Sequence, residues 1–315
     1  MNAAPIRKLL VPVFFLLSAG IALGAEAKIG ILLKAKGTFW TSVEKGATEA
    51  SQALGAELIV RSPLSETDVA VQVKLLNALA AQGIQALIIA PTNKDALAAP
   101  VAAIAAKGIK VVVIDSPLAG DAPHVFVGTN QKGAGEAAGK FLATLVQGKD
   151  EVSFLKNIQG SGATEEREGT ALVKLREAFP EIVVHGDVYA CTEKGMEEER
   201  AAFMLSKYPN TKTIFASSTL GSMAMLKVLQ EKGLTGRIKF VGFGFNLNPE
   251  VAQAIESGAM QAWVAQLPKE MGHRAVESAM ALIKGQTVPA VVNTGCIVIT
   301  KDNLKDPNVQ ALLSL

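Results

Sequence analysis

The chain has 315 residues, of which 49% are hydrophobic and 19% are charged, and this composition is typical of globular proteins with a large core. Its length suits two domains of about 100–200 residues each. The formal net charge is only +2, so the sequence lacks the basic surplus that nucleic-acid binding requires, and we expect no nucleic-acid partner.

The first 27 residues have the pattern of a secretory signal peptide. A short basic pair, Arg7-Lys8, precedes an apolar run from Leu9 to Leu23, and Ala25-Glu26-Ala27 matches a small-x-small cleavage site. A charged sequence follows at once, which favours a removed leader over a membrane span. We predict cleavage after Ala27, with cleavage after Gly24 as the alternative, and therefore a secreted, periplasmic protein.

The two cysteines, Cys191 and Cys296, would then enter an oxidising compartment. They could form a disulfide with each other, or remain two separate buried thiols. Sequence alone does not bring them within bonding distance, so both interpretations stay open.

Apolar runs and helical spacings alternate along the rest of the chain. Strands are predicted at 29–33, 57–60, 85–90, 110–114 and 124–127, and helices at 43–50, 69–81 and 95–106. A second series has strands at 151–155, 182–188, 213–216, 239–243 and 260–264, helices at 133–146, 165–179, 194–208, 221–232, 249–257 and 269–284, and an extended tail at 291–300. This alternation predicts an α/β protein of two lobes, each with a parallel sheet flanked by helices.

The stretch from 28 to 50 gives the first indication of a site. A buried strand ends at Leu33, Lys34 follows it, and Phe39 and Trp40 stand just before the next helical pattern. In an open α/β sheet, ligands bind beyond the carboxyl ends of the strands. We therefore predict that these three side chains contact a ligand, and the alternative is that the two aromatics only close the top of a core. Stacking by Trp40 predicts that Trp40→Ala weakens binding and leaves folding nearly intact.

Polar side chains follow the other predicted strands as well. They are Asp115, Ser116, Arg167, Ser218, Asn246 and Gln266. Hydrogen-bonding groups of both kinds beside flat aromatic rings suit a sugar-like polyol. Each residue also has a purely structural interpretation: a turn acceptor for Asp115, an ion pair with glutamates for Arg167, a helix cap for Ser218 and a hinge position for Gln266.

Several enzyme motifs are missing from the sequence. There is no phosphate loop of the G-x-x-x-x-G-K-[ST] type and no G-x-S-x-G nucleophile elbow. The three histidines, His124, His185 and His273, lack the spacing of metal ligands. We expect no enzymatic activity, no metal and no cofactor.

These residues also carry a resemblance to a known family. The stretches that carry it are IGILLK…GTFWTSVEKGA, IIAPTNKDAL, VVVIDSPL, FVGTNQKGAGEAAG, GATEEREG, IFASSTLGSMAMLKVL, FVGFGF, WVAQLP and NTGCIVITKDNL. In their order and spacing they resemble the periplasmic sugar-binding proteins of ABC importers, the ribose-binding-like group of type I periplasmic binding proteins.

The resemblance implies two Rossmann-like lobes joined by three crossover hinge segments. It implies an N-terminal lobe of residues 28–130 plus 267–290 and a C-terminal lobe of residues 131–266 plus 291–315. A monomer would clamp a small sugar-like ligand between the lobes and deliver it to a membrane permease. The ligand-binding positions would be Lys34, Phe39, Trp40, Asp115, Ser116, Arg167, Ser218, Asn246 and Gln266.

The sequence departs from the family pattern in three places. Ser116 stands where pentose-binding members often have arginine, and Ser218 stands where they often have asparagine. Gly244 stands where they have aspartate, with Asn246 two residues further on. These departures argue against ribose itself and leave another sugar, a sugar alcohol or another small polar solute.

Three other functions remain as alternatives. A periplasmic sensor that presents its ligand to a chemoreceptor or sensor kinase would have the same fold. A secreted sugar-modifying enzyme would need a catalytic set, which the sequence does not show. A repressor of related fold would need an N-terminal helix-turn-helix segment, where this chain has a predicted signal peptide instead.

Overall fold

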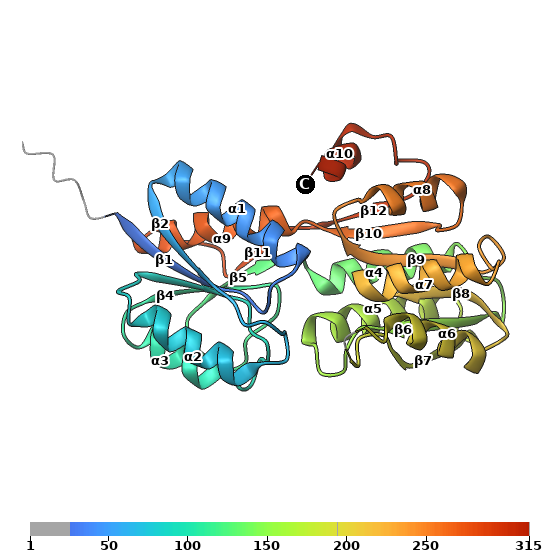
Figure 1. The fold of residues 1–315 in the computed structure, drawn as a ribbon, viewed down its shortest axis with the longest axis horizontal. Coiled ribbons are helices and arrows are strands. Elements are labelled where there is room, and N and C mark those ends of the chain that lie inside the picture. The colour runs from blue at the N-terminus through green and yellow to red at the C-terminus, as the bar shows by residue number, and fades with distance from the viewer. Residues whose placement is uncertain (1–25, 194, 315) are drawn as a thin grey trace, which may run out of the picture.

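The computed structural model describes residues 26–193 and 195–314, so most of the predicted signal peptide lies outside the described residues. The described chain forms two lobes side by side, each built on a six-stranded sheet with helices on both faces (Figure 1). This confirms the predicted α/β architecture. Among the described residues, no helix combines the length and the apolar character that crossing a membrane requires.

The first lobe contains a wholly parallel sheet in the order β11-β5-β4-β3-β1-β2. Its strands are β1 (Ala27–Leu32), β2 (Ala56–Arg61), β3 (Ala86–Ile89), β4 (Lys110–Ile114), β5 (Val125–Gly128) and β11 (Val291–Asn293). Helices α1 (Thr38–Leu54) and α9 (Pro268–Ile283) cover one face, and α2 (Val69–Ala80) and α3 (Ala98–Ala105) cover the other. The central strands are apolar on both sides because both faces are buried.

The second lobe has the sheet order β12-β10-β9-β8-β6-β7. Its strands are β6 (Glu151–Lys156), β7 (Val183–Tyr189), β8 (Thr211–Ala216), β9 (Lys239–Phe245), β10 (Ala262–Gln266) and β12 (Cys296–Ile299). Helices α4 (Gln131–Ala143) and α5 (Gly162–Ala178) pack on one face, and α6 (Glu197–Lys207), α7 (Thr219–Glu231), α8 (Pro249–Ser257) and α10 (Pro307–Gln310) on the other. The edge strand β12 runs antiparallel to β10, an exception to the predicted parallel pairing.

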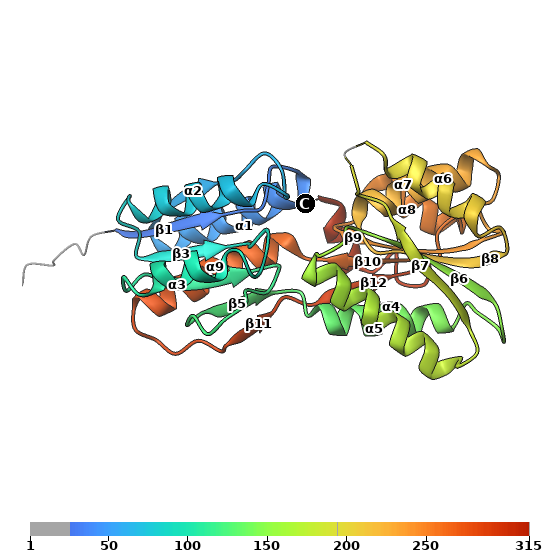
Figure 2. The same cartoon turned by 90° about the horizontal axis from the view of Figure 1, so that it is seen from below.

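The chain crosses between the lobes three times, and the three connections pass through the same narrow waist (Figure 2). The crossings follow β5, β10 and β11. Hydrogen bonds join them, because the Asn130 backbone N–H donates to the Asn293 side chain at 3.0 Å and the Gln131 amide donates to Gln266 at 3.2 Å. The three hinge segments are thus linked to one another by hydrogen bonds.

The third crossing lies later than predicted. Residues 291–293, which the sequence analysis placed in the C-terminal lobe, form β11 and pair with β5 in the first sheet. The predicted boundary after residue 290 is therefore wrong by three residues. The reason is that an extended tail has no internal signal for which sheet edge it joins, since pairing depends on a partner strand distant in sequence.

Glycines permit two close helix contacts that fix the lobes to the waist. A Cβ atom on Gly135 of α4 would lie 2.4 Å from the Arg167 carbonyl oxygen of α5, and one on Gly46 of α1 would lie 1.9 Å from the Lys269 carbonyl oxygen of α9. Because α4 and α9 begin directly after two of the crossings, both helix pairs link a hinge segment rigidly to a lobe.

Candidate functional site

The carboxyl ends of β1 and β4 bring three of the predicted residues together. Lys34 extends from the end of β1, and its Nζ lies 2.7 Å from Asp115 Oδ2 and 2.5 Å from Ser116 Oγ. Ser116 Oγ donates to the same carboxylate oxygen at 2.8 Å. All three side chains are buried, so the attraction between ammonium and carboxylate is only weakly screened by water. Asp115 adopts φ = 63°, a left-handed conformation that aspartate tolerates better than most residues.

A buried glutamine that the sequence analysis did not identify fixes the neighbouring loops. The Gln72 amide donates to the carbonyl oxygens of Leu33 and Ala90, and its oxygen accepts from the Thr92 N–H and hydroxyl. Gln72 has no exposed surface. It hydrogen-bonds carbonyl oxygens at the ends of β1 and β3 and so fixes the position of Leu33, the residue immediately before Lys34.

The two predicted aromatics differ in their environment. Trp40 is only 5% exposed, belongs to the first-lobe core and donates its Nε1–H to Glu66 at 2.8 Å. Phe39 is half-buried and meets Trp40 edge-on, with ring centroids 4.9 Å apart. It also meets Phe245 of the second lobe edge-on at 5.3 Å. The expectation that Trp40→Ala would leave folding nearly intact is therefore wrong, because truncating a buried tryptophan costs about 3–5 kcal/mol.

In the second lobe, Arg167 forms the centre of a buried network. Its Nε and Nη2 donate to Gln131 Oε1 at 3.0 and 2.7 Å, and its Nη1 donates to the Ser217 carbonyl at 2.5 Å. The guanidinium lies 3.5 Å from the centre of the Phe243 ring. Burial lowers the pKa of Arg167 to about 10, and the nearby Asp115 carboxylate partly opposes this shift.

Gln131 connects Arg167 to the waist. Its oxygen accepts from the arginine while its amide donates to Gln266 Oε1 at 3.2 Å, and both glutamines are buried. Two predicted residues, Arg167 and Gln266, are thus brought together through a third that was not predicted. Gln131 lies two residues before the helix predicted at 133–146, so no local sequence pattern indicated its role.

Beside Arg167 lies a buried carboxyl group that was also not predicted as part of the site. Glu168 Oε1 accepts from the Asn157 backbone N–H at 3.1 Å and from the Ser217 hydroxyl. Burial raises the pKa of Glu168, and the hydrogen bonds from Ser217 and Asn157 partly oppose this shift. Glu168 is therefore a buried residue of α5, although it stands in a run of charged residues, glutamates and an arginine.

Asn246 occupies the strand end that faces the first lobe. It follows β9 with φ = 52°, and its Nδ2 lies 3.4 Å from Ser42 Oγ of α1. Its Oδ1 is buried and has no hydrogen-bond partner among the described residues. At Gly244, in contrast, a Cβ atom would lie 2.3 Å from the Trp263 ring, so the fold leaves no room for a side chain there.

The Ser218 hydroxyl makes no hydrogen bond to the other predicted residues. Its hydroxyl caps α7 by accepting from the Gly221 N–H at 3.3 Å, which is its structural interpretation. Neighbouring Cys191 and the more distant Cys296 are both free thiols, so the disulfide is not formed. Burial raises the pKa of Cys191 to about 11, which keeps its thiol protonated at neutral pH.

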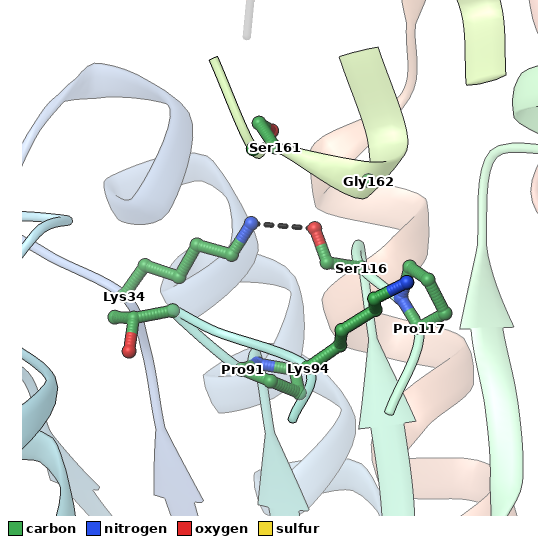
Figure 3. A pocket seen from close by; sticks show the side chains of 9 residues that line it. Lys34, Pro91, Lys94, Ser116, Pro117, Ser161 and Gly162 are labelled. Atoms are coloured by element: carbon green, nitrogen blue, oxygen red, sulfur yellow. Dashed lines mark hydrogen bonds between the residues drawn. The ribbon is translucent and has the colours of Figure 1, made fainter. Parts of the chain in front are cut away.

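The lobes are in contact around a small cavity. Its lining comes from Lys34, Pro91, Thr92, Lys94, Ser116 and Pro117 of the first lobe and Gly160, Ser161 and Gly162 of the second. Figure 3 shows Lys34 and Ser116 facing each other below the loop that carries Ser161 and Gly162. The cavity volume is about 20 Å³, room for one water molecule, so a larger ligand requires the lobes to move apart.

Among the described residues, no group of three or more histidine, cysteine or carboxylate side chains has the arrangement of a metal site. His185 instead stacks on Tyr208 with ring centroids 3.8 Å apart and contacts Glu151 at 3.0 Å.

The sequence was compared with protein families and with known proteins, and both comparisons point to the same family. Residues 29–287 match the periplasmic binding protein domain family. The chain is 28% identical to the ribose import binding protein of Salmonella typhimurium over 279 residues, which cover 87% of this chain and 91% of that protein.

Two solved structures are similar over nearly their whole length. The carbohydrate transporter solute binding protein of Agrobacterium radiobacter, in complex with D-arabinose, has a TM-score of 0.84 at 28% identity, covering 92% of this chain and 99% of that one. An ABC transporter solute binding protein of Agrobacterium vitis, bound with α-D-tagatopyranose, has a TM-score of 0.83 at 26% identity, covering 91% and 99%. The similar proteins thus bind different sugars on one fold.

Proposed function

The chain belongs to the periplasmic binding protein family, and from this we propose that it captures a small sugar or sugar-like polyol between its lobes and delivers it to an ABC importer. The observation that carries the proposal is the convergence of hydrogen-bonding side chains from both lobes on one interlobe region. Lys34 and Asp115 approach it from the first lobe, and Asn246 approaches it from the second.

The proposed ligand contacts are the nine residues predicted from the sequence. Phe39 supplies a ring face, while Lys34, Asp115, Arg167 and Asn246 supply donors and acceptors for hydroxyl groups. The unpartnered oxygen of Asn246 supports this role, because a buried acceptor without a donor is costly and a ligand hydroxyl would satisfy it. Ser218 is retained as a proposed contact with less support, since its hydroxyl already caps a helix.

Binding would proceed by hinge closure. The ligand touches both lobes only when they are together, so it favours the closed arrangement over the open one. The linked crossings at the waist support this mechanism because they let the lobes rotate as two units while Gln131 and Gln266 keep the segments together. The closed shape is what we propose the permease recognises.

The related proteins are solute-binding proteins, and we propose the same role here without enzymatic activity. We further propose that the protein works in the periplasm as a monomer with no nucleic-acid partner. The predicted signal peptide and the periplasmic relatives support this location.

A thermal-shift screen of residues 28–315 against sugars, sugar alcohols, amino acids and nucleosides tests the proposal. A ligand that binds only the folded state raises the melting temperature by mass action. We expect shifts with one or a few sugar-like compounds. Shifts only with amino acids or nucleosides would overturn the sugar assignment, and detectable turnover of a bound sugar would overturn the non-enzymatic role.

A further inference from the structure

Arg167 is a buried cation that has no carboxylate oxygen within 4.0 Å among the described residues. The side chain is 3% exposed, and its three hydrogen bonds all go to uncharged oxygens, those of Gln131 and Ser217. A guanidinium has five N–H donors, so two remain for other partners. A buried charge is costly unless a charge of opposite sign accompanies it. The network therefore has an unmet requirement for an anion.

The carboxyl groups near Arg167 already have other partners. Asp115 is bound to Lys34 at 2.7 Å and to Ser116 at 2.8 Å, and these contacts neutralise it. Glu168 is bound to the Asn157 N–H and the Ser217 hydroxyl and makes no hydrogen bond to Arg167. Lys34, Asp115 and Arg167 together leave one positive charge where the lobes meet.

The second lobe does not provide a carboxylate at the strand end that faces the first lobe. Gly244 cannot carry a side chain beside Trp263, and Asn246, which takes the facing position, is uncharged. A neutral sugar would therefore leave the excess positive charge uncompensated.

The rim of the cavity adds to the positive potential. Lys94 is exposed and lines the cavity, and α5 begins on its opposite side with Ser161, whose side chain makes no capping hydrogen bond. A helix N-terminus carries a partial positive charge. Two carboxylates lie nearby, Glu165 on the Gly160 N–H at 2.7 Å and Glu66 on the Trp40 N–H, and their negative charges offset part of this potential.

We propose that the ligand is a sugar that bears one anionic group, such as the carboxylate of a sugar acid. This inference rests on the proposed function and specifies the ligand class of the same site. The anion would lie against the free N–H donors of Arg167 and complete the charge balance that the two lobes leave open. The monoester phosphate of a sugar would offer the same chemistry with more charge.

Isothermal titration calorimetry with matched ligands tests the proposal. Each set contains one neutral aldose, its aldonate, its uronate and its phosphate ester, titrated into the same preparation of residues 28–315. Because hydrogen bonds to charged groups are the stronger ones, we expect an acid to bind at least about tenfold more tightly than its neutral parent. Its affinity should also fall as salt is raised, in contrast to that of the parent.

Charge variants add a second readout. Asn246→Asp restores a carboxylate in the cleft without changing side-chain size, and we expect it to weaken binding of the acid at least about tenfold while affecting the neutral sugar less. Lys94→Gln should weaken the acid modestly. Lys107→Gln, at the far end of α3 from the cavity, is the matched control and should have no effect.

The outcomes separate the two proposals. Preference for a carboxylate or for a phosphate supports the anionic class and identifies which group supplies the charge. Neutral sugars binding as tightly as their acids, or an Asn246→Asp variant that keeps its full affinity for the acid, would overturn the inference and leave the proposed function standing. Binding of no sugar of either kind would overturn both.

Discussion

Gln131 is the residue whose replacement tests the buried network most directly. Gln131→Met keeps the length and nearly the volume of the side chain but removes the oxygen that accepts two N–H groups of Arg167, at 3.0 and 2.7 Å. It also removes the donor to Gln266. A hydrogen bond to a charged group contributes about 1.5–3 kcal/mol, and an unsatisfied buried donor costs a similar amount. We expect Gln131→Met to lower the free energy of unfolding of the second lobe by about 2–4 kcal/mol.

The protein offers an assay for each lobe separately. Its two tryptophans are divided between the lobes, Trp40 in the first core and Trp263 in the second. In a Trp40→Phe background, the emission of Trp263 during urea unfolding follows the second lobe alone. Gln147→Met replaces an exposed glutamine of the same lobe and serves as the control, with a change expected within about 0.5 kcal/mol.

A double variant gives the reasoning its sharpest test. Adding Arg167→Met to Gln131→Met removes the charge that the first substitution leaves unsatisfied, and replacing both partners of a buried polar pair is often nearly neutral. We therefore expect the double variant to recover at least about 1 kcal/mol relative to Gln131→Met alone. Two results would refute this account: losses of unfolding free energy from Gln131→Met and Arg167→Met that add in the double variant, or a Gln131→Met variant as stable as the Gln147→Met control. Either would mean that the hydrogen bonds between Gln131 and Arg167 do not stabilise the second lobe.

Three further predictions concern packing, pH and stacking. Gly135→Ala should lower the free energy of unfolding by about 1–3 kcal/mol, because its Cβ would clash with the Arg167 carbonyl. Gly169→Ala, on an open helix surface, is the control and should raise it by up to about 1 kcal/mol. Equal shifts of the two melting curves would contradict the close packing. Burial raises the pKa of Glu168, so the free energy of unfolding of the wild type falls as pH rises through the raised pKa. Glu168→Gln cannot titrate, so its free energy of unfolding relative to wild type should grow from pH 4 to pH 8, and a constant difference would refute this. Phe39→Ala should weaken ligand binding at least about tenfold in calorimetry, and an unchanged affinity would exclude ring stacking. Because Phe39 is only half-buried, its replacement should cost less stability than Trp40→Ala.

The fold could be predicted from the sequence because its signals are local. Apolar β-branched runs such as 110–114 mark buried parallel strands, and the residues that follow them mark the edge of each sheet where we propose that the ligand binds. The first and last residues of the elements were harder to predict from the sequence. The third helix was expected from residue 95 but begins at Ala98, because the Asn93 side chain accepts from the N–H groups of Asp95 and Ala96 and holds a turn there.

The site was only partly predictable because its network is not local. Lys34 and Asp115 stand directly after strands, so their meeting follows from the parallel sheet. Gln131, by contrast, acts through partners distant in sequence, and its role depends on how α4 packs on α5. The choice between Gly244 and Asn246 was also beyond the sequence, since it depends on the position of the Trp263 ring.

The interleaved connectivity also constrains the order in which the chain becomes folded during synthesis. The first-lobe core includes residues of α9, among them Met271 and Val276, and the second-lobe core includes Leu304, Val309 and Leu312 near the end of the chain. Neither core is therefore complete while the residues after 267 are still absent. A nascent chain would keep apolar sheet faces uncovered until almost its full length had emerged, and the two lobes would then finish together. If the chain is secreted as we propose, such late completion keeps it unfolded while it passes through the membrane.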